Sequence, residues 1–505
     1  MFINFIKLFV VILTLLFCGC SLDLEVASER EYMAQALKYQ KQVDQQNEEP
    51  IKAPLSFYDV IARVLKYNLD YKTQSLRRTY AFAQFEDSQM AFWPNLNSSI
   101  EFSSRDNFSG SVSQSLITGN TSLAASTSAE RNIWQGELDL SWDILDFGLS
   151  YARAKQLGNQ VLIAREEERK VINNIIKEAV ATYWEALLAQ RMLPQLLEVD
   201  REVAKLLGQY KKINEQGLKN PKELFQLRRE LLLTARQIKS LQQRLIGAEV
   251  KLASLMNLAP SVRYKLSENG LPTIYKLENL NLDTLILYAL QYRPEMRAII
   301  YQERITEQER KGIFLEMLPN LKLAVSNTGS SNTFLVNQSW MQSGLSTSWN
   351  LFNILKTPKK LKTVDLKKVV ESYEAQVLAR AVSAQVHISL ARALHAEESL
   401  SVVLDYSENQ NQLFKQANAE FKGGKINKQE LLKEKLSLLI ANLEKNQSYA
   451  DFQKTEAVLL ETVGHDLFPE KSIINDYSVK ELAELLKVSW KDKFKMLHNS
   501  TELQR

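Results

Sequence analysis

Two histidines on one predicted helix are the first residues whose type could support chemistry. His387 and His395 lie eight residues apart in the sequence. A zinc-binding helix places its two histidines four residues apart, so that both reach one metal from the same face. The observed spacing therefore favours ordinary helix residues, and we expect no metal site.

The motifs of nucleotide-driven and hydrolytic enzymes are missing from the sequence. Asp146-Phe147-Gly148 has the letters of a kinase triplet, but the glycine-rich loop and the HRD segment that accompany it in kinases are absent. The phosphate loops GxxxxGKS and GxxxxGKT, the zinc motif HExxH and the nucleophile elbow GxSxG are absent as well. We therefore expect neither an enzyme nor a cofactor, and energy for any work must come from a partner.

The composition favours long regular elements. Glycine (16) and proline (11) together make 27 of 505 residues, less than half of their usual share of roughly 12%. The 63 basic and 59 acidic side chains nearly cancel to a net charge of +4 and form no like-charged block. Nucleic acid is therefore not an expected partner.

The amino-terminal segment indicates where the protein is sent. Residues 1–19 carry Lys7 followed by an apolar stretch, which predicts a secretory signal peptide. The segment ending in Cys20 resembles the lipobox of bacterial lipoproteins, which implies cleavage before Cys20 and a covalent acyl chain such as palmitate on its sulfur. Cleavage would remove Cys18, the other cysteine of the chain, so disulfides are excluded. Ser21 then implies the outer membrane of a Gram-negative bacterium, and the alternative is an ordinary signal peptide with an accidental cysteine.

One unit of the sequence is used twice. Residues 65–102 can be laid over residues 290–327 with a shift of 225, and Trp142 falls over Trp349 with a shift of 207. We therefore predict two repeats that differ in the length of one loop. The predicted organisation is a lipid-anchored extension at 20–56, a first repeat at 57–257, an equatorial linker at 258–282, a second repeat at 283–464 and an equatorial tail at 465–505.

Each repeat contains a predicted β-hairpin. Apolar and polar residues alternate in strands at about 96–104 and 133–143, and more weakly at about 321–327 and 339–351. Such strands have the length of tilted outer-membrane strands, although a soluble sheet with one solvent-exposed face gives the same pattern. In the membrane case the polar face carries Glu101, Glu137 and Asp139 into a barrel lumen, and the membrane-interface aromatics are Trp134, Trp142 and Trp349.

Long helices flank each hairpin. The sequence predicts runs of roughly 70 residues at 147–216 and 355–422, each about 100 Å long. Helices of half that length would stack end to end against them, and Pro194 would kink its helix rather than stop it. The shorter helices are predicted at 57–93 and 222–257 in the first repeat and at 283–318 and 429–464 in the second.

The number of strands predicts an oligomer. Four strands cannot close a barrel, and an open edge in lipid leaves backbone groups unpaired. Three copies would supply twelve strands, an even number in the known range. The predicted fold is therefore mainly α with a transmembrane β part: a duplicated helix-hairpin-helix unit forms a trimeric α-helical periplasmic tunnel continuous with a 12-stranded outer-membrane β-barrel.

The chain resembles outer-membrane efflux proteins of the TolC family, in its lipid-anchored branch. The resemblance rests on Pro94-Asn95 and Pro319-Asn320, on LSWDILDFGLSYARAKQ at 140–156, on YRPE at 292–295 and on the glycine turns with NPKEL and NKQEL. It implies a homotrimeric channel-tunnel that exports drugs or solutes, or proteins by type I secretion. Such a duct works with a periplasmic adaptor protein and an inner-membrane pump. Asn353-Ile354-Leu355 replaces Asp146-Phe147-Gly148 in the second repeat, so we expect that turn to be built differently.

The resemblance also implies a periplasmic gate at the helix tips, at 209–224 and 416–430. We expect the tip glycines to supply the positive φ of sharp turns and a bare backbone for the adaptor. Glu215 and Glu420, repeated around a threefold axis, would form acidic rings, unless they are only solvated helix-end charges. The predicted gate and docking residues are Glu215, Gly217, Lys219, Glu420, Gly423 and Gly424.

A structural function is the alternative to a channel. In that case the chain is a lipid-anchored helical rod of the periplasm without channel activity, and its hairpins form a soluble sheet. Channel conductance by a trimer from outer-membrane fractions would separate the two functions.

Overall fold

The computed structural model divides the chain into two units, residues 1–50 and residues 51–505. In the first unit, helix α2 (Glu29–Asp44) is capped by Ser28, whose hydroxyl accepts a hydrogen bond from the Glu31 backbone amide. The predicted signal peptide and Cys20 lie outside the described residues. The structure describes residues 27–44, 49–51, 53–122, 124–215, 221–259, 262–267, 277, 280–468, 474 and 477–499.

Two very long helices dominate the second unit. Helix α5 (Ile144–Glu215) has 72 residues and helix α10 (Phe352–Lys422) has 71. At about 1.5 Å per residue each extends for roughly 105 Å. Pro194 lies inside α5, which continues past it, so the prediction that this proline does not stop the helix is confirmed.

The shorter helices on the amino-terminal side of each hairpin come in pairs, so the prediction of one unbroken helix at 57–93 and another at 283–318 was wrong. Asn68 is extended and its side chain accepts hydrogen bonds from the amides of Asp70 and Tyr71, which starts a new helix. Arg293 is extended because Pro294 pushes its predecessor out of the helical region. The four helices are α3 (Phe57–Tyr67), α4 (Leu69–Met90), α8 (Leu282–Tyr292) and α9 (Pro294–Leu315).

The returning helices differ between the two halves of the chain. Helix α11 (Lys428–Val463) is unbroken, whereas the helix predicted at 222–257 is divided into α6 (Pro221–Leu245) and α7 (Ala248–Leu255). Gly247, with φ of +93°, separates α6 from α7, because a left-handed residue cannot continue a right-handed helix. The last described helix is α12 (Val479–Asn499).

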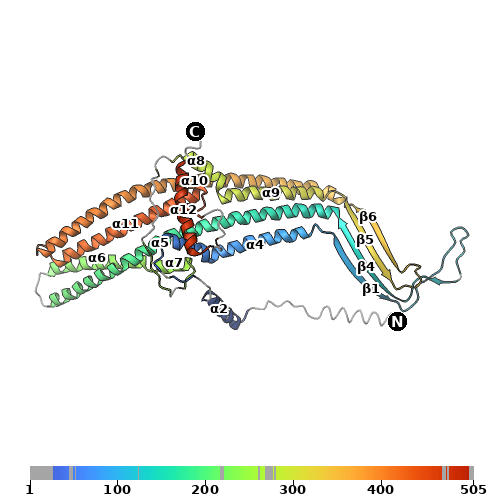
Figure 1. The fold of residues 1–505 in the computed structure, drawn as a ribbon, viewed down its shortest axis with the longest axis horizontal. Coiled ribbons are helices and arrows are strands. Elements are labelled where there is room, and N and C mark those ends of the chain that lie inside the picture. The colour runs from blue at the N-terminus through green and yellow to red at the C-terminus, as the bar shows by residue number, and fades with distance from the viewer. Residues whose placement is uncertain are drawn as a thin grey trace. The chain divides into compact units, whose positions relative to one another are not determined.

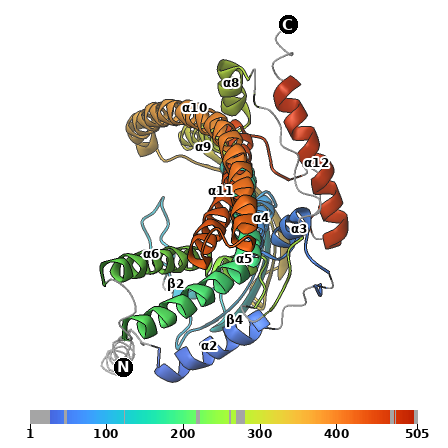
Figure 2. The same cartoon turned by 90° about the vertical axis from the view of Figure 1, so that its left-hand side faces the viewer.

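The helices of the second unit are arranged side by side in an arc. In the half of the unit that adjoins the strands, α4 packs on α5, α5 on α9, and α9 on α10. Towards the α10–α11 turn the order is α6, α5, α11 and α10, which Figure 2 shows from that end. The α4–α5–α9–α10 order is therefore a wall one helix thick with two free edges, α4 and α10.

The strands form one antiparallel sheet in the order β1-β4-β5-β6 at one end of these helices (Figure 1). The two hairpins are joined because β4 pairs with β5, for example Glu137 with Thr328. Strand β5 extends three residues beyond the predicted end, and β6 ends three residues before it. The strands are β1 (Asn95–Ser104), β4 (Asn132–Asp143), β5 (Asn320–Ser330) and β6 (Ser339–Ser348), with β2 (Gly110–Ser111) and β3 (Ser126–Thr127) as a separate pair in the long loop.

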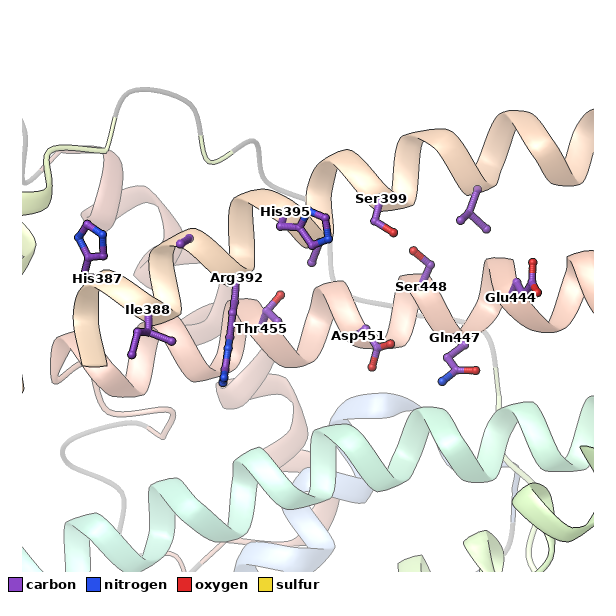
Figure 3. Close-up of a pocket in the computed structure, with 13 residues that line it drawn as sticks. His387, Ile388, Arg392, His395, Ser399, Glu444, Gln447, Ser448, Asp451 and Thr455 are labelled. Carbon is purple, nitrogen blue, oxygen red and sulfur yellow. The ribbon is translucent and has the colours of Figure 1, made fainter. Parts of the chain in front are cut away.

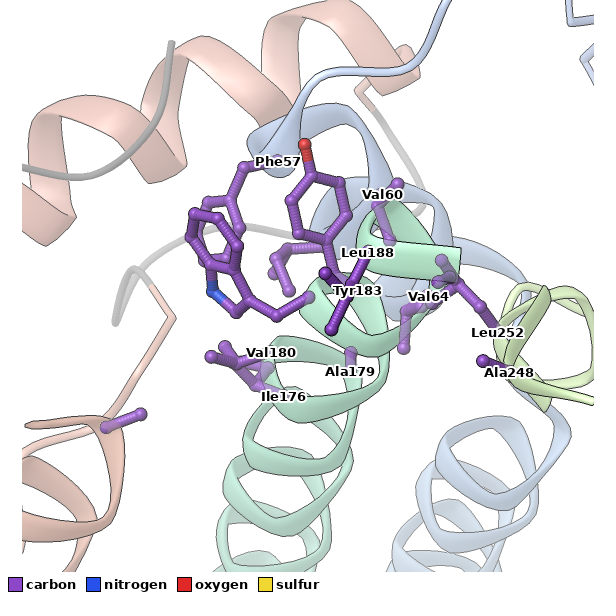
Figure 4. Close-up of a cluster of buried hydrophobic side chains, with 14 of the residues drawn as sticks. Phe57, Val60, Val64, Ile176, Ala179, Val180, Tyr183, Leu188, Ala248 and Leu252 are labelled. Carbon is purple, nitrogen blue, oxygen red and sulfur yellow. The ribbon is translucent and has the colours of Figure 1, made fainter. Parts of the chain in front are cut away.

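The hydrophobic core surrounds the middle of α5, where α3, α7 and α12 contact it or one another (Figure 4). Phe57 is completely buried, and its ring meets those of Tyr183 and Trp490 edge to face at centroid distances of 5.3 and 5.7 Å. The Tyr183 hydroxyl donates a hydrogen bond to the Ser267 carbonyl over 2.7 Å. Among the described helices, none has both the length and the apolar composition that a membrane span requires.

Candidate functional site

The register of the sheet places the predicted acidic residues on one face. Glu137 pairs with Ser99 on one side and with Thr328 on the other, and Asp139 pairs with Asn97 and Ser326. Side chains of paired residues point to the same side of a sheet, and successive residues alternate. Glu101, which pairs with Gln135, therefore shares this polar face with Glu137 and Asp139.

The opposite face of the sheet is apolar and open to solvent in the single chain. Trp134 and Trp142 are 57% and 43% exposed, and the Trp134 ring lies 4.7 Å from that of Phe102. Adjacent strands continue the face, because Leu140 pairs with Val325, which places apolar side chains next to each other across the repeats. The exposed apolar residues of this face are Leu96, Ile100, Phe102, Trp134, Leu138, Leu140, Trp142, Leu323, Val325, Met341 and Leu345.

The two strand-to-helix junctions are built differently, as the sequence indicates. Strand β4 passes directly into α5, so that Asp146 lies in the first turn of the helix. In the second half, residues 349–351 separate β6 from α10, and the Asn350 side chain accepts a hydrogen bond from the Phe352 amide over 3.2 Å. Trp349 lies in this junction rather than in the strand, and its indole N–H donates to the Met317 carbonyl over 2.9 Å.

The α10–α11 turn is closed by backbone hydrogen bonds. The amide of Gly424 donates to the Phe421 carbonyl over 3.0 Å, and the amide of Lys425 donates to the Glu420 carbonyl over 2.9 Å. This pair of bonds defines a Schellman motif, which needs one left-handed residue. Gly424 supplies it with φ of +70°, whereas Gly423 has φ of −82°. The expectation of a positive φ at Gly423 was therefore wrong, because a single left-handed residue completes the turn.

The structure describes the whole of the predicted tip at 416–430. Glu420 is half-buried, and its Oε1 accepts a hydrogen bond from the side-chain amide of Gln416 over 3.0 Å. Helix α11 then begins with a capping box between Asn427 and Glu430. Glu215 is the last residue of α5, and Gly217 and Lys219 lie outside the described residues.

Near this tip, an ion pair joins helix α11 to helix α5. The Nζ atom of Lys435 on α11 lies 2.8 Å from Glu198 and 3.6 Å from Glu202, both on α5. The hydrogen bond from Lys435 holds the pKa of the Glu198 carboxyl below its ordinary value. The sequence alone did not indicate this link, because its members are more than 230 positions apart and charged residues are common on both helices.

A second charged cluster joins four elements in the middle of the helices. Arg169 on α5 contacts Glu166 and also Asp466, which follows α11, at 3.0 Å. Arg293, at the start of α9, donates to Gln385 of α10 over 2.6 Å and contacts Glu295. Burial raises the pKa of Glu295, but the neighbouring charges of Arg293 and Lys170 outweigh it and leave that pKa below its ordinary value. The YRPE run is therefore a structural joint.

The two histidines line a groove between α10 and α11 with a volume of about 680 Å³ (Figure 3). His387 and His395 come from α10, and Glu444 and Asp451 line the same groove from α11. Eight residues of helix separate the imidazoles by about 12 Å along the axis, too far for one metal ion. Within the described ranges, no group of three or more His, Cys, Asp and Glu residues could hold a metal ion.

Comparisons with known proteins agree with this architecture. Residues 60–258 match the family model described as "Outer membrane efflux protein", whereas no curated protein matches the chain. The outer-membrane channel OprN is 17% identical, with a TM-score of 0.61 over 81% of this chain and 89% of that one. The MtrE outer membrane channel of Neisseria gonorrhoeae is 14% identical, with a TM-score of 0.60 over 81% and 89%. The CmeC outer membrane channel of Campylobacter jejuni is 14% identical, with a TM-score of 0.59 over 89% and 95%. At these identities the matches establish a shared fold.

Proposed function

We propose that the chain forms an outer-membrane export duct, and the match of residues 60–258 to the outer membrane efflux protein family model supports this proposal. Three copies close a 12-stranded β-barrel that continues into an α-helical periplasmic tunnel. The single observation that carries this proposal is the four-stranded sheet, which has an apolar face, a polar face and two unpaired edges.

The edges of the sheet support closure by further copies. In the described sheet, β1 and β6 each pair with only one strand of the same chain. Their outer backbone groups need partners, because lipid offers none. Strand β6 of one copy can pair with β1 of the next, and this head-to-tail contact closes into a ring. Three chains of four strands give twelve, an even number within the range of known barrels.

The helices beneath the sheet carry matching free surfaces. Helix α10, at one edge of the wall, has an apolar stripe whose members are each more than half exposed. Its spacing of three or four residues keeps the stripe on one face of the helix. Helix α4, at the other edge, exposes Leu69, Leu76 and Tyr80 at helical spacing. The residues of the α10 stripe are Leu366, Val369, Val370, Tyr373 and Val377.

The polar face of the sheet would line the barrel. Glu101, Glu137 and Asp139 would then make the lumen acidic and favour cations. The membrane would contact the apolar face, with Trp134 and Trp142 among its interfacial aromatics and Trp349 at the junction to the helices. Transport through such a duct requires no covalent step, so the chain works as a conduit rather than as an enzyme.

The duct would depend on partners for energy and selectivity. A periplasmic adaptor protein would dock on the tips at Glu215, Gly217, Lys219, Glu420, Gly423 and Gly424, and an inner-membrane pump would drive export. The open backbone of the Schellman turn at Gly424 supports the docking role. An acyl chain on Cys20 would anchor each copy in the outer membrane.

Purification from outer-membrane fractions tests the proposal directly. We expect a trimer by native mass spectrometry and stepwise conductance after reconstitution in planar lipid bilayers. Val370→Asp should weaken the trimer, because it would bury a charge in the α10 stripe. Ser372→Asp, at an exposed position about 160° around the helix from Val370, should leave the trimer intact. A monomer without conductance would instead support the lipid-anchored rod.

Partner capture tests the tips. A photo-cross-linking residue at the exposed Lys425 should trap an adaptor in intact cells. The same residue at Lys362, far along α10 from the turn, should not trap it. Equal capture at both positions would remove the docking assignment.

A further inference from the structure

The polar face of the sheet carries a single aromatic residue, Trp340. Thr328 pairs with Trp340, and Thr328 also pairs with Glu137, in ladders whose successive residues pair without a bulge. Trp340 therefore lies on the face of Glu137 and Asp139, opposite to its neighbour Met341. Within the four paired strands, Phe102, Trp134 and Trp142 are all on the other face.

Trp340 and Glu137 lie in one row across the sheet. The row runs Ser99, Glu137, Thr328, Trp340, from β1 to β6. Strands are spaced by about 4.8 Å, so the backbones at Glu137 and Trp340 are about 10 Å apart. Thr328, which stands between them, is only 5% exposed, whereas Trp340 is 37% exposed. An indole, a hydroxyl and a carboxylate are thus arranged in line.

A membrane role does not explain this tryptophan. Interfacial aromatics lie on the lipid side of a barrel, and here that side is the apolar face. On the polar face an indole breaks the alternation of the strand and exposes apolar surface to water. A side chain that breaks the local pattern is expected at a functional or strained site.

We propose that Trp340 and Glu137 form a binding site in the duct for organic cations that carry an aromatic or other flat apolar group. This inference rests on the proposed function, because the polar face must line the lumen. The indole would receive the flat group and attract its positive charge through the electron-rich ring face. Glu137 supplies the opposite charge, and Thr328 lies between the two. In a trimer the site occurs three times at one level of the lumen.

Current block in planar bilayers tests the site, with tetraphenylphosphonium as the aromatic cation and tetrabutylammonium as the aliphatic one. In the unmodified trimer we expect tetraphenylphosphonium to block at the lower concentration. Trp340→Leu should raise its blocking concentration about five- to tenfold and leave block by tetrabutylammonium unchanged. Trp340→Phe should retain most of the block, because it keeps an aromatic ring. Glu137→Gln should weaken block by both cations.

Controls separate this inference from the duct itself. Trp134→Leu, on the opposite face of the same sheet, should leave the block by both cations unchanged. If the channels conduct but Trp340→Leu leaves tetraphenylphosphonium block unchanged, the binding site is refuted while the duct stands. If trimers in lipid give no conductance, the duct is refuted and the binding site with it. Folding of each variant is checked by its conductance in potassium chloride.

Discussion

Lys435 on α11 donates a hydrogen bond to Glu198 on α5, with 2.8 Å between Nζ and Oε1. Glu198 belongs to the α5–α6 pair and Lys435 to the α10–α11 pair, and α5 and α11 pack directly against each other between these pairs. The contact therefore joins the α5–α6 pair to the α10–α11 pair near the proposed docking tip. Sliding of α5 along α11 by more than the reach of the lysine side chain would break this contact.

Removing this lysine should loosen the joint. In Lys435→Gln, Glu198 and Glu202 lose a charged partner, so the distance between α5 and α11 should become more variable. Spin labels at the exposed positions Arg201 and Lys433 would report this as a broader distance distribution in pulsed electron paramagnetic resonance. Lys415→Gln, at an exposed position of α10, is the matched control. Identical distributions in both variants would mean that the contact does not hold the helices.

Acid should loosen the same joint in the unmodified protein. Lys435 lowers the pKa of Glu198 in the folded state. A carboxyl group with a lowered folded pKa stabilises the fold above its ordinary pKa, and the contribution disappears as the pH falls through the lowered value. The distance distribution should therefore approach that of Lys435→Gln at low pH. In that variant the same titration should produce a smaller change.

Gly464→Ala should destabilise the protein. Gly464 ends α11 with φ of +91°, and a Cβ there would lie 2.9 Å from the Arg293 amide nitrogen and 3.0 Å from the Tyr292 carbonyl carbon. Backbone strain of this kind costs about 1 to 3 kcal/mol. Gly208→Ala is the matched control, because Gly208 lies inside α5 with no atom within 4 Å of the added methyl group. It should stabilise the helix by about 1 kcal/mol. The midpoint of thermal denaturation should therefore fall for Gly464→Ala and rise for Gly208→Ala. A lower midpoint for Gly208→Ala would contradict this account.

Trp490→Ala should detach α12 from α3. Trp490 is 4% exposed, and its ring packs edge to face on Phe57. Truncation of a buried aromatic side chain costs about 3 to 5 kcal/mol, because apolar contacts are lost and a cavity remains. Limited proteolysis should cut the variant near α12 much faster than the unmodified protein. Val488→Ala, at a position that is 61% exposed on the same helix, should be cut at the unmodified rate.

Cation preference should depend on the polar face of the sheet. Replacing Glu137 by Gln and Asp139 by Asn removes two negative charges per chain. The reversal potential in a salt gradient should therefore shift towards zero, the value for a channel that does not discriminate between cations and anions. Glu484→Gln removes a charge on α12, away from the sheet, and should leave the potential unchanged. If the double variant keeps its full cation preference, these carboxylates do not line the conducting path.

Local patterns in the sequence were sufficient for the two longest helices and for the two hairpins. Long runs without breakers predict α5 and α10, and a period of two predicts the hairpins. The same patterns place Glu137 and Asp139 on one strand face before any pairing is known. The breaks at Asn68 and Gly247 were missed, because one residue changes the direction of a helix without changing the composition around it.

Trp340 could have been found from the sequence. It has the same parity as Gln342, Gly344, Ser346 and Ser348 in β6, all of which are polar or small. Its aromatic character draws attention to the membrane side, whereas its position in the alternation assigns it to the polar side. The alternation is the stronger signal, because successive side chains of a β-strand must point to opposite faces of the sheet.

The sequence by itself determined where the long helices and the hairpins lie and which face of each strand is apolar, since those properties depend on neighbours within a few positions. Only the tertiary structure decided that β4 pairs with β5, that Lys435 meets Glu198 and that Arg293 packs against the end of α11. These contacts join segments more than 150 residues apart, and many registers and charge pairs would satisfy the local pattern equally well. The choice among them is made by the packing of the whole helical wall, where all the contacts must fit at once.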